Sequence, residues 1–240
     1  MDEIIKLSRS TVEKYINCKR CCVLEKNYNI RPPSLPFTLN IAVDNLCKNE
    51  FDYYRELEKP HPLFVKHGID AVPFKHKNLN IWRSNFKGLR YRSIQHQYDF
   101  GGAIDDVWMK SNGELVVVDV KATSKNVFDW EETFNKYEYP KAYKRQLEMY
   151  QWLFEKNGFK VAKEAYLVYF NGKKHEKFFN NMLQFDVHII KLICSNHWVE
   201  EKIIETVELL RSNSFPKPSS NCELCNYLQK RWILSQKIHK

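Results

Sequence analysis

Two hydrophobic periods divide the chain into expected strands and helices. Residues 114–123, ELVVVDVKAT, are a nearly continuous apolar run of strand length and predict a buried central strand. The apolar residues before them, joined through Ser111-Asn112-Gly113, predict an antiparallel hairpin with this strand. Helical spacing is expected over residues 7–18, 40–57, 140–157 and 198–211. The pattern predicts an α/β fold in which helices flank a mixed central sheet.

More strands are expected in the second half of the chain. The runs EAYLVYF (164–170) and HEKFF (175–179) are separated by Asn171-Gly172, which predicts a second hairpin. A further strand is expected at LQFDVHII (183–190). There is no internal repeat or low-complexity tract, so residues 1–240 are predicted to form a single elaborated domain.

Two charged residues interrupt the central apolar run. Asp119 and Lys121 are two positions apart, so on a strand they project from the same face, about 7 Å apart. Charged side chains are rarely buried unless they are paired or bind a ligand. The strand therefore carries either a structural ion pair or the floor of a functional site.

The hairpin has two possible registers, and they place different aspartates opposite Asp119. A two-residue Asn112-Gly113 turn sets Asp106 opposite Asp119, whereas a three-residue loop with Gly113 in the left-handed region sets Asp105 there. Turn chemistry suits both forms. Either register brings two carboxylates and a lysine together, and two facing carboxylates favour a cation between them. Mg²⁺ or Mn²⁺ prefers such oxygen ligands.

Overall charge and hydropathy favour a protein that binds a polyanion and does not span a membrane. The chain has 38 Lys and Arg against 29 Asp and Glu, a net charge of +9 that suits a polyanionic partner such as nucleic acid. The N-terminal MDEIIKL lacks the basic and apolar character of a secretory signal, and no apolar run is long enough to span a membrane. A cytoplasmic protein without a membrane partner is expected.

Four of the seven cysteines form two C-x-x-C pairs, Cys18 with Cys21 and Cys222 with Cys225. In a reducing compartment these cysteines are expected to bind a metal in preference to forming disulfides. Four thiolates suit an iron-sulfur cluster or structural zinc, and the spacing does not choose between them.

Three short motifs in the same order resemble those of the PD-(D/E)XK nuclease superfamily, within it the RecB-like and CRISPR spacer-acquisition exonuclease branch. Gly102-Ala103-Ile104-Asp105 resembles G-x-x-D, Asp119-Val120-Lys121 resembles D-x-K, and Gln146 with Tyr150 resembles the Q-x-x-x-Y helix motif. The resemblance favours Asp105 over Asp106. It implies a restriction-endonuclease-like fold and a DNA exonuclease activity that depends on Mg²⁺ or Mn²⁺.

The resemblance also implies roles for individual residues. Asp105, Asp119 and the Val120 carbonyl would hold the metal, Lys121 would assist catalysis, and Gln146 and Tyr150 would position the substrate strand or the water. Many members have a metal-binding histidine near residue 44, where this chain has Asp44, with Glu50 a weaker candidate. In related members four cysteines bind a 4Fe-4S cluster. Here Arg231 stands where the last of them is expected, and Cys21 would replace it.

The substrate would be single-stranded DNA or a duplex end. Lys141, Lys144 and Arg145 precede Gln146 on the same expected helix and would hold backbone phosphates, or else form a solvated face. Two other functions fit the same fold: a non-catalytic nucleic-acid-binding protein, and a partner subunit of a helicase-nuclease assembly in repair or recombination. The sequence has no G-x-x-x-x-G-K-[ST] motif, so a helicase would be a separate chain.

Overall fold

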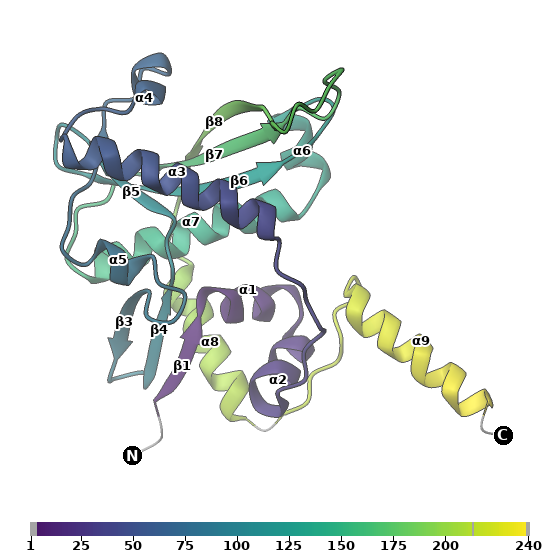
Figure 1. Ribbon diagram of the computed structural model, residues 1–240. Helices are drawn as coiled ribbons and strands as arrows, with labels where there is room; N and C mark the ends of the chain where they lie inside the picture. Colours follow the sequence, from purple (N-terminus) through teal and green to yellow (C-terminus); the bar gives the residue numbers. More distant parts are fainter. Residues whose placement is uncertain (1–3, 213, 239–240) are drawn as a thin grey trace. The chain divides into compact units, whose positions relative to one another are not determined.

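The computed structural model describes residues 4–212 and 214–238 and divides the chain into two compact units (Figure 1). We call them the terminal unit and the central unit. The terminal unit comprises Met1–Ser34, Arg92–Phe100 and Trp198–Lys240, and the central unit comprises Leu35–Tyr91 and Gly101–His197. Whether residues 1–240 behave as the single domain expected from the sequence stays a prediction.

The central unit is built on a five-stranded mixed sheet with the order β2-β5-β6-β7-β8. Its strands are β2 (Val72–Pro73), β5 (Asp106–Met109), β6 (Leu115–Thr123), β7 (Glu164–Gly172) and β8 (Phe185–Ile193). Strands β6 and β7 run parallel, and the other neighbouring pairs are antiparallel. The predicted α/β fold, a mixed sheet flanked by helices, is confirmed.

Two long helices cover opposite faces of β6. Helix α3 (Thr38–Glu56) packs Cys47 and Phe51 into an apolar core with Trp108, Val116 and Val118. Helix α7 (Tyr139–Lys156) lies on the other face, where its Gln146 meets Asp119. Because side chains alternate along a strand, Val116, Val118 and Val120 of β6 pack in the core under α3, and Asp119 points to α7.

The remaining elements are short helices of the central unit and the helices and small sheet of the terminal unit. The central unit also contains α4 (Pro62–Lys66), α5 (Leu79–Trp82) and α6 (Trp130–Lys136). The terminal unit contains β1 (Ile5–Ser8), α1 (Arg9–Asn17), α2 (Lys19–Tyr28), α8 (Val199–Arg211) and α9 (Glu223–Ile238). Strands β3 (Leu89–Ser93) and β4 (Tyr98–Gly102) complete a three-stranded sheet of order β1-β4-β3. Two of the boundaries between the units fall inside these two strands.

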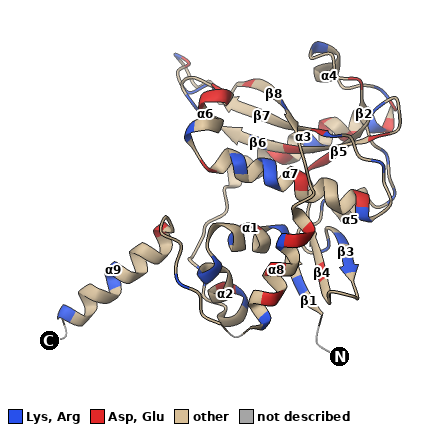
Figure 2. Ribbon diagram, turned by 180° about the vertical axis from the view of Figure 1, so that it is seen from behind, with Lys and Arg blue, Asp and Glu red and all other residues tan. Residues whose placement is uncertain are grey.

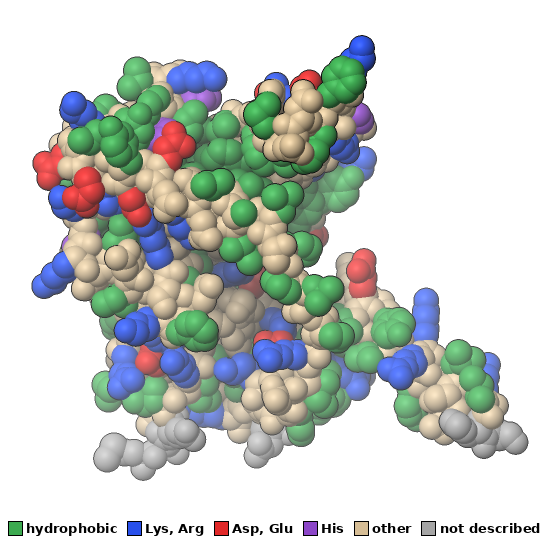
Figure 3. All heavy atoms as spheres, viewed as in Figure 1, with side chains coloured by type: hydrophobic (Ala, Val, Ile, Leu, Met, Phe, Trp, Pro, Cys, Tyr) green, Lys and Arg blue, Asp and Glu red, His purple; other side chains and the backbone are tan. Residues whose placement is uncertain are grey.

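Helix α9 buries little of its surface. Cys225 is its one buried residue among those described, whereas the side chains of Tyr227 and Trp232 are exposed, and hydrophobic atoms appear on its surface in Figure 3. None of the helices in the described ranges 4–212 and 214–238 is long and apolar enough to cross a membrane.

The β5–β6 hairpin adopts the three-residue register. Asp106 pairs with Val118 and Met109 with Leu115, so Ser111-Asn112-Gly113 forms the loop, with Gly113 at φ +79°. The Gly113 N–H donates to the Lys110 carbonyl at 2.9 Å, which closes the turn. Continuing this register by one residue sets Asp105, not Asp106, opposite Asp119.

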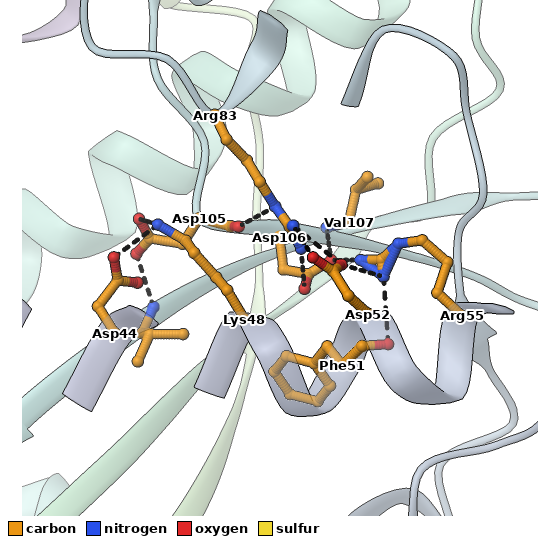
Figure 4. A network of polar contacts seen from close by, with 10 residues as sticks. Asp44, Lys48, Phe51, Asp52, Arg55, Arg83, Asp105, Asp106 and Val107 are labelled. Carbon is orange, nitrogen blue, oxygen red and sulfur yellow. Dashed lines mark hydrogen bonds and ion pairs between the residues drawn. The ribbon is translucent and has the colours of Figure 1, made fainter. Parts of the chain in front are cut away.

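Asp106 is instead part of a buried ionic network (Figure 4). Its side chain is fully buried and pairs with Arg55 of α3 and with Arg83, the latter at 2.8 Å. Arg83 also binds both carboxylate oxygens of Asp52, at 2.8 and 2.9 Å. The two neighbouring aspartates have different surroundings: Asp106 begins β5 and points into this network, whereas Asp105 lies just before the strand.

One sequence-based prediction about the sheet was wrong. HEKFF is not a strand, and β7 pairs with β8 through the connection 173–184, with Gly172 opposite Phe185. Asn171 belongs to β7, where its side chain accepts from the Lys125 N–H at 2.7 Å and donates to the Lys125 carbonyl at 3.2 Å. These bonds keep Asn171 in the sheet, and Phe178 and Phe179 stay exposed in the connection.

Substitution of Asp106 is expected to destabilise the protein more than substitution of Asp105. Asp106→Ala removes the buried carboxylate that pairs with both Arg55 and Arg83 and leaves them only the partly exposed Asp52. We expect a loss of about 3–5 kcal/mol in the free energy of unfolding. Asp105→Ala is the matched control, with a smaller loss because the Asp105 side chain is partly exposed. Urea unfolding of both variants measures the difference, and equal losses would contradict a structural role specific to Asp106.

Candidate active site

Asp119 lies at the centre of the polar cluster on β6. It is fully buried. The Lys121 ammonium contacts its Oδ2, and Gln146 Nε2 donates to its Oδ1 at 2.7 Å. The carboxylate is thus held from two sides, by a neighbour on its own strand and by a side chain of α7.

Asp105 lies beside Asp119 in the connection between β4 and β5. Its Oδ2 accepts from the Val120 N–H at 2.9 Å, and its Oδ1 is 3.5 Å from Lys48 Nζ. Its main-chain carbonyl accepts from Arg83 Nε at 3.1 Å, so the buried network of Asp106 also fixes the backbone of Asp105. The structure therefore brings together Asp105, Asp119 and Lys121, the three residues singled out in the D-x-K hairpin.

Helix α7 supplies the second side of the cluster. Gln146 and Tyr150 are one helical turn apart and share a face, as expected for positions i and i+4. The Tyr150 hydroxyl donates to the Ala103 carbonyl, which secures the connection that carries Asp105. One turn earlier, the Tyr143 ring lies 4.7 Å from Lys121 Nζ, a distance suited to a cation–π contact. These contacts orient the cluster's own groups.

Helix α3 contributes Asp44 and Lys48. Lys48 Nζ is 2.6 Å from Asp44 Oδ2, so the Lys48 ammonium joins Asp44 to Asp105 (Figure 4). Asp44, the preferred candidate at the position of the family histidine, lies in the cluster, and its role as a metal ligand stays a prediction. Glu50 does not lie in the cluster, because its side chain is exposed and binds His61 at 3.0 Å.

The crowding of charges shifts the acidity of these carboxyl groups in opposite directions. Burial, with a further contribution from Asp105, raises the pKa of Asp119 to about 7 despite the neighbouring Lys121. For Asp105, burial also acts to raise the pKa, but Lys121, Lys48 and the Val120 N–H outweigh it, and the pKa is lowered. Burial and the nearby Asp105 raise the pKa of Asp44.

The cluster has an unmet demand for a cation. Asp44 Oδ1 is buried and has no hydrogen-bond partner among the described residues. Asp119 Oδ2 is likewise buried without a hydrogen bond among the described residues, although the Lys121 ammonium contacts it, and the raised pKa of Asp119 agrees with this. Carboxylate oxygens near a protein surface are the ligands that Mg²⁺ and Mn²⁺ prefer, so the donor set fits a hard divalent ion.

Lys141, Lys144 and Arg145, near the start of α7, are half-buried, and Figure 2 shows Lys and Arg in blue on this helix. Lys141 pairs with Glu138 at 2.6 Å, and Lys144 lies 3.9 Å from Glu148. The Lys141–Glu138 pair lies on the surface and is weak, so a polyanion can displace it at little cost, whereas Glu148 is buried. A phosphate-binding role for these three residues stays a prediction.

In the terminal unit, the two C-x-x-C pairs come together. The ligand atoms of Cys18, Cys21, Cys222 and Cys225 all lie within 4.8 Å of one another. Cys21 Sγ is 3.5 Å from Cys222 Sγ and 3.4 Å from Cys225 Sγ, and Cys18 Sγ is 3.9 Å from Cys225 Sγ. Cys18 begins α2 and Cys225 lies in α9, so the cluster joins segments from the two ends of the chain.

The acidity of these thiols also indicates a cation site. Burial acts to raise the pKa of Cys18, but hydrogen bonds from the backbone of Ser219 and Cys21 and from neighbouring thiols outweigh it and lower the pKa to about 6. Burial and the neighbouring sulfurs raise the pKa of Cys21, and that of Cys225 rises to about 11. The Cys18 thiolate is therefore favoured in the absence of a cation, and a bound metal ion would stabilise the thiolates of Cys21 and Cys225.

A comparison with known families decides the assignment. A family model described as the PD-(D/E)XK nuclease superfamily matches residues 38–229. The chain belongs to this superfamily. Members of this nuclease superfamily hydrolyse phosphodiester bonds with the help of divalent metals, so nucleic acid is the implied substrate. The predicted superfamily is confirmed, and its RecB-like branch stays a prediction.

Two solved structures are similar to this PD-(D/E)XK chain. The crystal structure of SSO0001 is 14% identical, covers 88% of this chain and 80% of its own, and has a TM-score of 0.40. A crystal structure named "Putative exonuclease" from Eubacterium rectale is 12% identical, covers 92% of this chain and 86% of its own, and has a TM-score of 0.42. No curated protein matches the chain.

Sequence reasoning missed three residues of the PD-(D/E)XK cluster. Lys48 lies four positions after Asp44 on one helix face, a spacing that was readable in the sequence. Tyr143 likewise precedes Gln146 by three positions on α7. Arg83 follows the short helix α5, in a segment without clear periodicity, and its contacts with Asp105 and Asp106 had no signal in the sequence.

The raised pKa of Asp119 predicts a pH-dependent effect of Asp119→Asn. A carboxyl pKa raised from 3.8 to about 7 makes the folded state lose stability as pH rises through this interval, and Asn does not titrate. We expect the variant to gain stability over the metal-free wild type between about pH 5 and about pH 8, by on the order of a few kcal/mol.

Urea unfolding with chelator at the two pH values measures this gain. Asp186→Asn is the control, because Asp186 is an exposed residue of β8 that pairs with Lys173 on the surface. A gain for Asp119→Asn that is equal at both pH values would contradict the raised pKa.

Proposed function

We propose that this protein is a metal-dependent DNA nuclease of the RecB-like branch, acting as an exonuclease on single strands or duplex ends. The observation that supports this proposal most is the convergence of Asp105, Asp119 and Lys121, with Gln146 bonded to Asp119. These residues come from the β4–β5 connection, from β6 and from α7, and the matched family model spans all of them.

In the proposed reaction Asp105, Asp119 and the Val120 carbonyl would hold Mg²⁺ or Mn²⁺. A bound ion of this class supplies a water of lowered pKa and offsets charge on the scissile phosphate. Gln146 fixes the Asp119 carboxylate by donating to its Oδ1. Lys121, placed by Asp119 and by the Tyr143 ring, donates to a phosphate oxygen or orients the attacking water.

Tyr150 contributes by position, through its bond to Ala103 next to the connection that carries Asp105. Lys141, Lys144 and Arg145 bind backbone phosphates along α7, which makes DNA binding weaken as salt concentration rises. The two other functions, a non-catalytic binding protein and a partner subunit of a helicase-nuclease assembly, have no specific observation in their favour.

We also propose that the four cysteines hold a structural metal. The resemblance implies a 4Fe-4S cluster, whereas the sulfur spacing supports zinc. A tetrahedral ion with Zn–S bonds of about 2.3 Å separates its sulfurs by about 3.8 Å. Three of the six sulfur pairs here are 3.4–3.9 Å apart, and all four sulfurs lie within 4.8 Å of one another. A four-iron cluster binds each thiolate to a different iron and so spaces the sulfurs more widely.

Cleavage of end-labelled DNA tests the nuclease proposal. Wild type, incubated with Mg²⁺ or Mn²⁺, is expected to cut single-stranded or duplex DNA, and chelator is expected to stop it. Asp119→Ala should abolish cutting, and Lys121→Ala should slow it by at least about 100-fold, because it removes a donor to developing charge. The product ladder reports exonuclease or endonuclease action.

Matched controls are Asp186→Ala and Lys173→Ala, which remove an exposed Asp–Lys pair elsewhere in the central unit. They are expected to cut like wild type. A wild type that binds DNA and cuts neither DNA nor labelled RNA under any of these conditions would overturn the nuclease proposal in favour of a binding protein.

Metal analysis with an absorption spectrum of anaerobically purified protein tests the cysteine proposal. We expect about one zinc per chain and no visible absorption. Cys222→Ser should lose most of the metal and melt at a lower temperature, because structural metal binding adds to folding free energy. Cys194→Ser, a buried cysteine outside the cluster, should keep the metal. A brown protein with iron would support the cluster instead, and a protein with neither metal would refute both.

A further inference from the structure

Lys48 lies among the carboxylates of the site rather than at its edge. Its Nζ is 2.6 Å from Asp44 Oδ2 and 3.5 Å from Asp105 Oδ1, and its side chain is largely buried (Figure 4). Lys121 occupies the corresponding place beside Asp119. Each carboxylate of the cluster is therefore in contact with an ammonium group.

The position of Lys48 follows from rigid elements. Asp44 and Lys48 are one turn apart on α3, whose Cys47 and Phe51 are packed in the core. Asp105 is held by the Val120 N–H and, through its carbonyl, by Arg83. The packed helix fixes the backbone of Asp44, other contacts fix Asp105, and Lys48 lies between the two carboxylates and contacts both.

The charges of the cluster set how many divalent ions it can accept. Asp44, Asp105 and Asp119 supply three negative charges when ionised, and Lys48 and Lys121 supply two positive ones. One divalent ion leaves the cluster with a single excess positive charge, which a scissile phosphate offsets. A second divalent ion would leave three, and uncompensated charge in a mostly buried site is costly.

We propose that Lys48 takes the place of a second divalent ion, so that the site loads one ion at Asp105 and Asp119 and rejects a second between Asp44 and Asp105. This inference rests on the proposed metal-dependent function. It assigns Lys48 a positioning role: the ammonium contacts one oxygen of Asp44 and one of Asp105 and occupies the space between them. Asp44 Oδ1 stays without a hydrogen-bond partner among the described residues.

Calorimetric titration with Mn²⁺, without DNA, tests the inference. The protein is used as purified, with its cysteine site occupied. Wild type is expected to bind one Mn²⁺, and Asp119→Ala is expected to lose it. Lys48→Gln, which removes the charge and keeps a similar length, is expected to bind a second Mn²⁺ at least about tenfold more tightly than wild type does, because a close like charge is gone.

Three further variants complete the design. Lys48→Arg keeps the charge and should keep one ion. Lys48→Met repeats the test should Lys48→Gln melt at a much lower temperature than wild type. Asp44→Asn combined with Lys48→Gln should lose the second ion, because that ion needs the Asp44 carboxylate.

The outcomes separate this inference from the proposed function. A wild type with two ions, or a Lys48→Gln protein that keeps one ion with unchanged affinity, overturns the role of Lys48 and leaves the metal-dependent nuclease standing. A wild type that binds no Mn²⁺ sensitive to Asp119→Ala overturns both.

Discussion

The three-residue loop of the β5–β6 hairpin is the constraint on which the site depends. Since side chains alternate along a strand, a slip of one residue would exchange Asp105 and Asp106 between two environments. In the observed register Asp106 joins Arg55 and Arg83 in a buried network, and Asp105 meets Asp119. Arg83 binds the Asp106 carboxylate and the Asp105 carbonyl together, so the network that stabilises the unit also fixes the site.

The site is held together by compensation of charge. A fully buried Asp119 close to Asp105 is unfavourable by itself, as its raised pKa indicates. Lys121, Lys48 and the Gln146 amide reduce this cost without removing it. A site with residual demand for positive charge is suited to binding a divalent ion and a phosphate in turn, because each arriving charge offsets one already present.

The two units hold their candidate ligand residues in place by different interactions. In the central unit, a sheet and two packed helices hold the carboxylates in place. In the terminal unit, α9 buries little surface beyond Cys225, and the cysteine cluster joins it to α2. A bound metal would replace the apolar contacts that α9 lacks, which gives a physical reason for cysteines at both ends of the chain.

The sequence by itself determined the elements that local patterns specify: the apolar strand with Asp119 and Lys121, the helix that presents Gln146 and Tyr150 on one face, and the two C-x-x-C pairs. Periodicity and spacing encode these features directly. The tertiary structure decided the hairpin register, because Asn-Gly suits both turns, and it decided the partner of β7, because Asn171 binds Lys125 instead of turning the chain. It also decided the positions of Lys48 and Arg83, which contact Asp105 and Asp106. These contacts join residues distant in the sequence, so no local pattern predicts them.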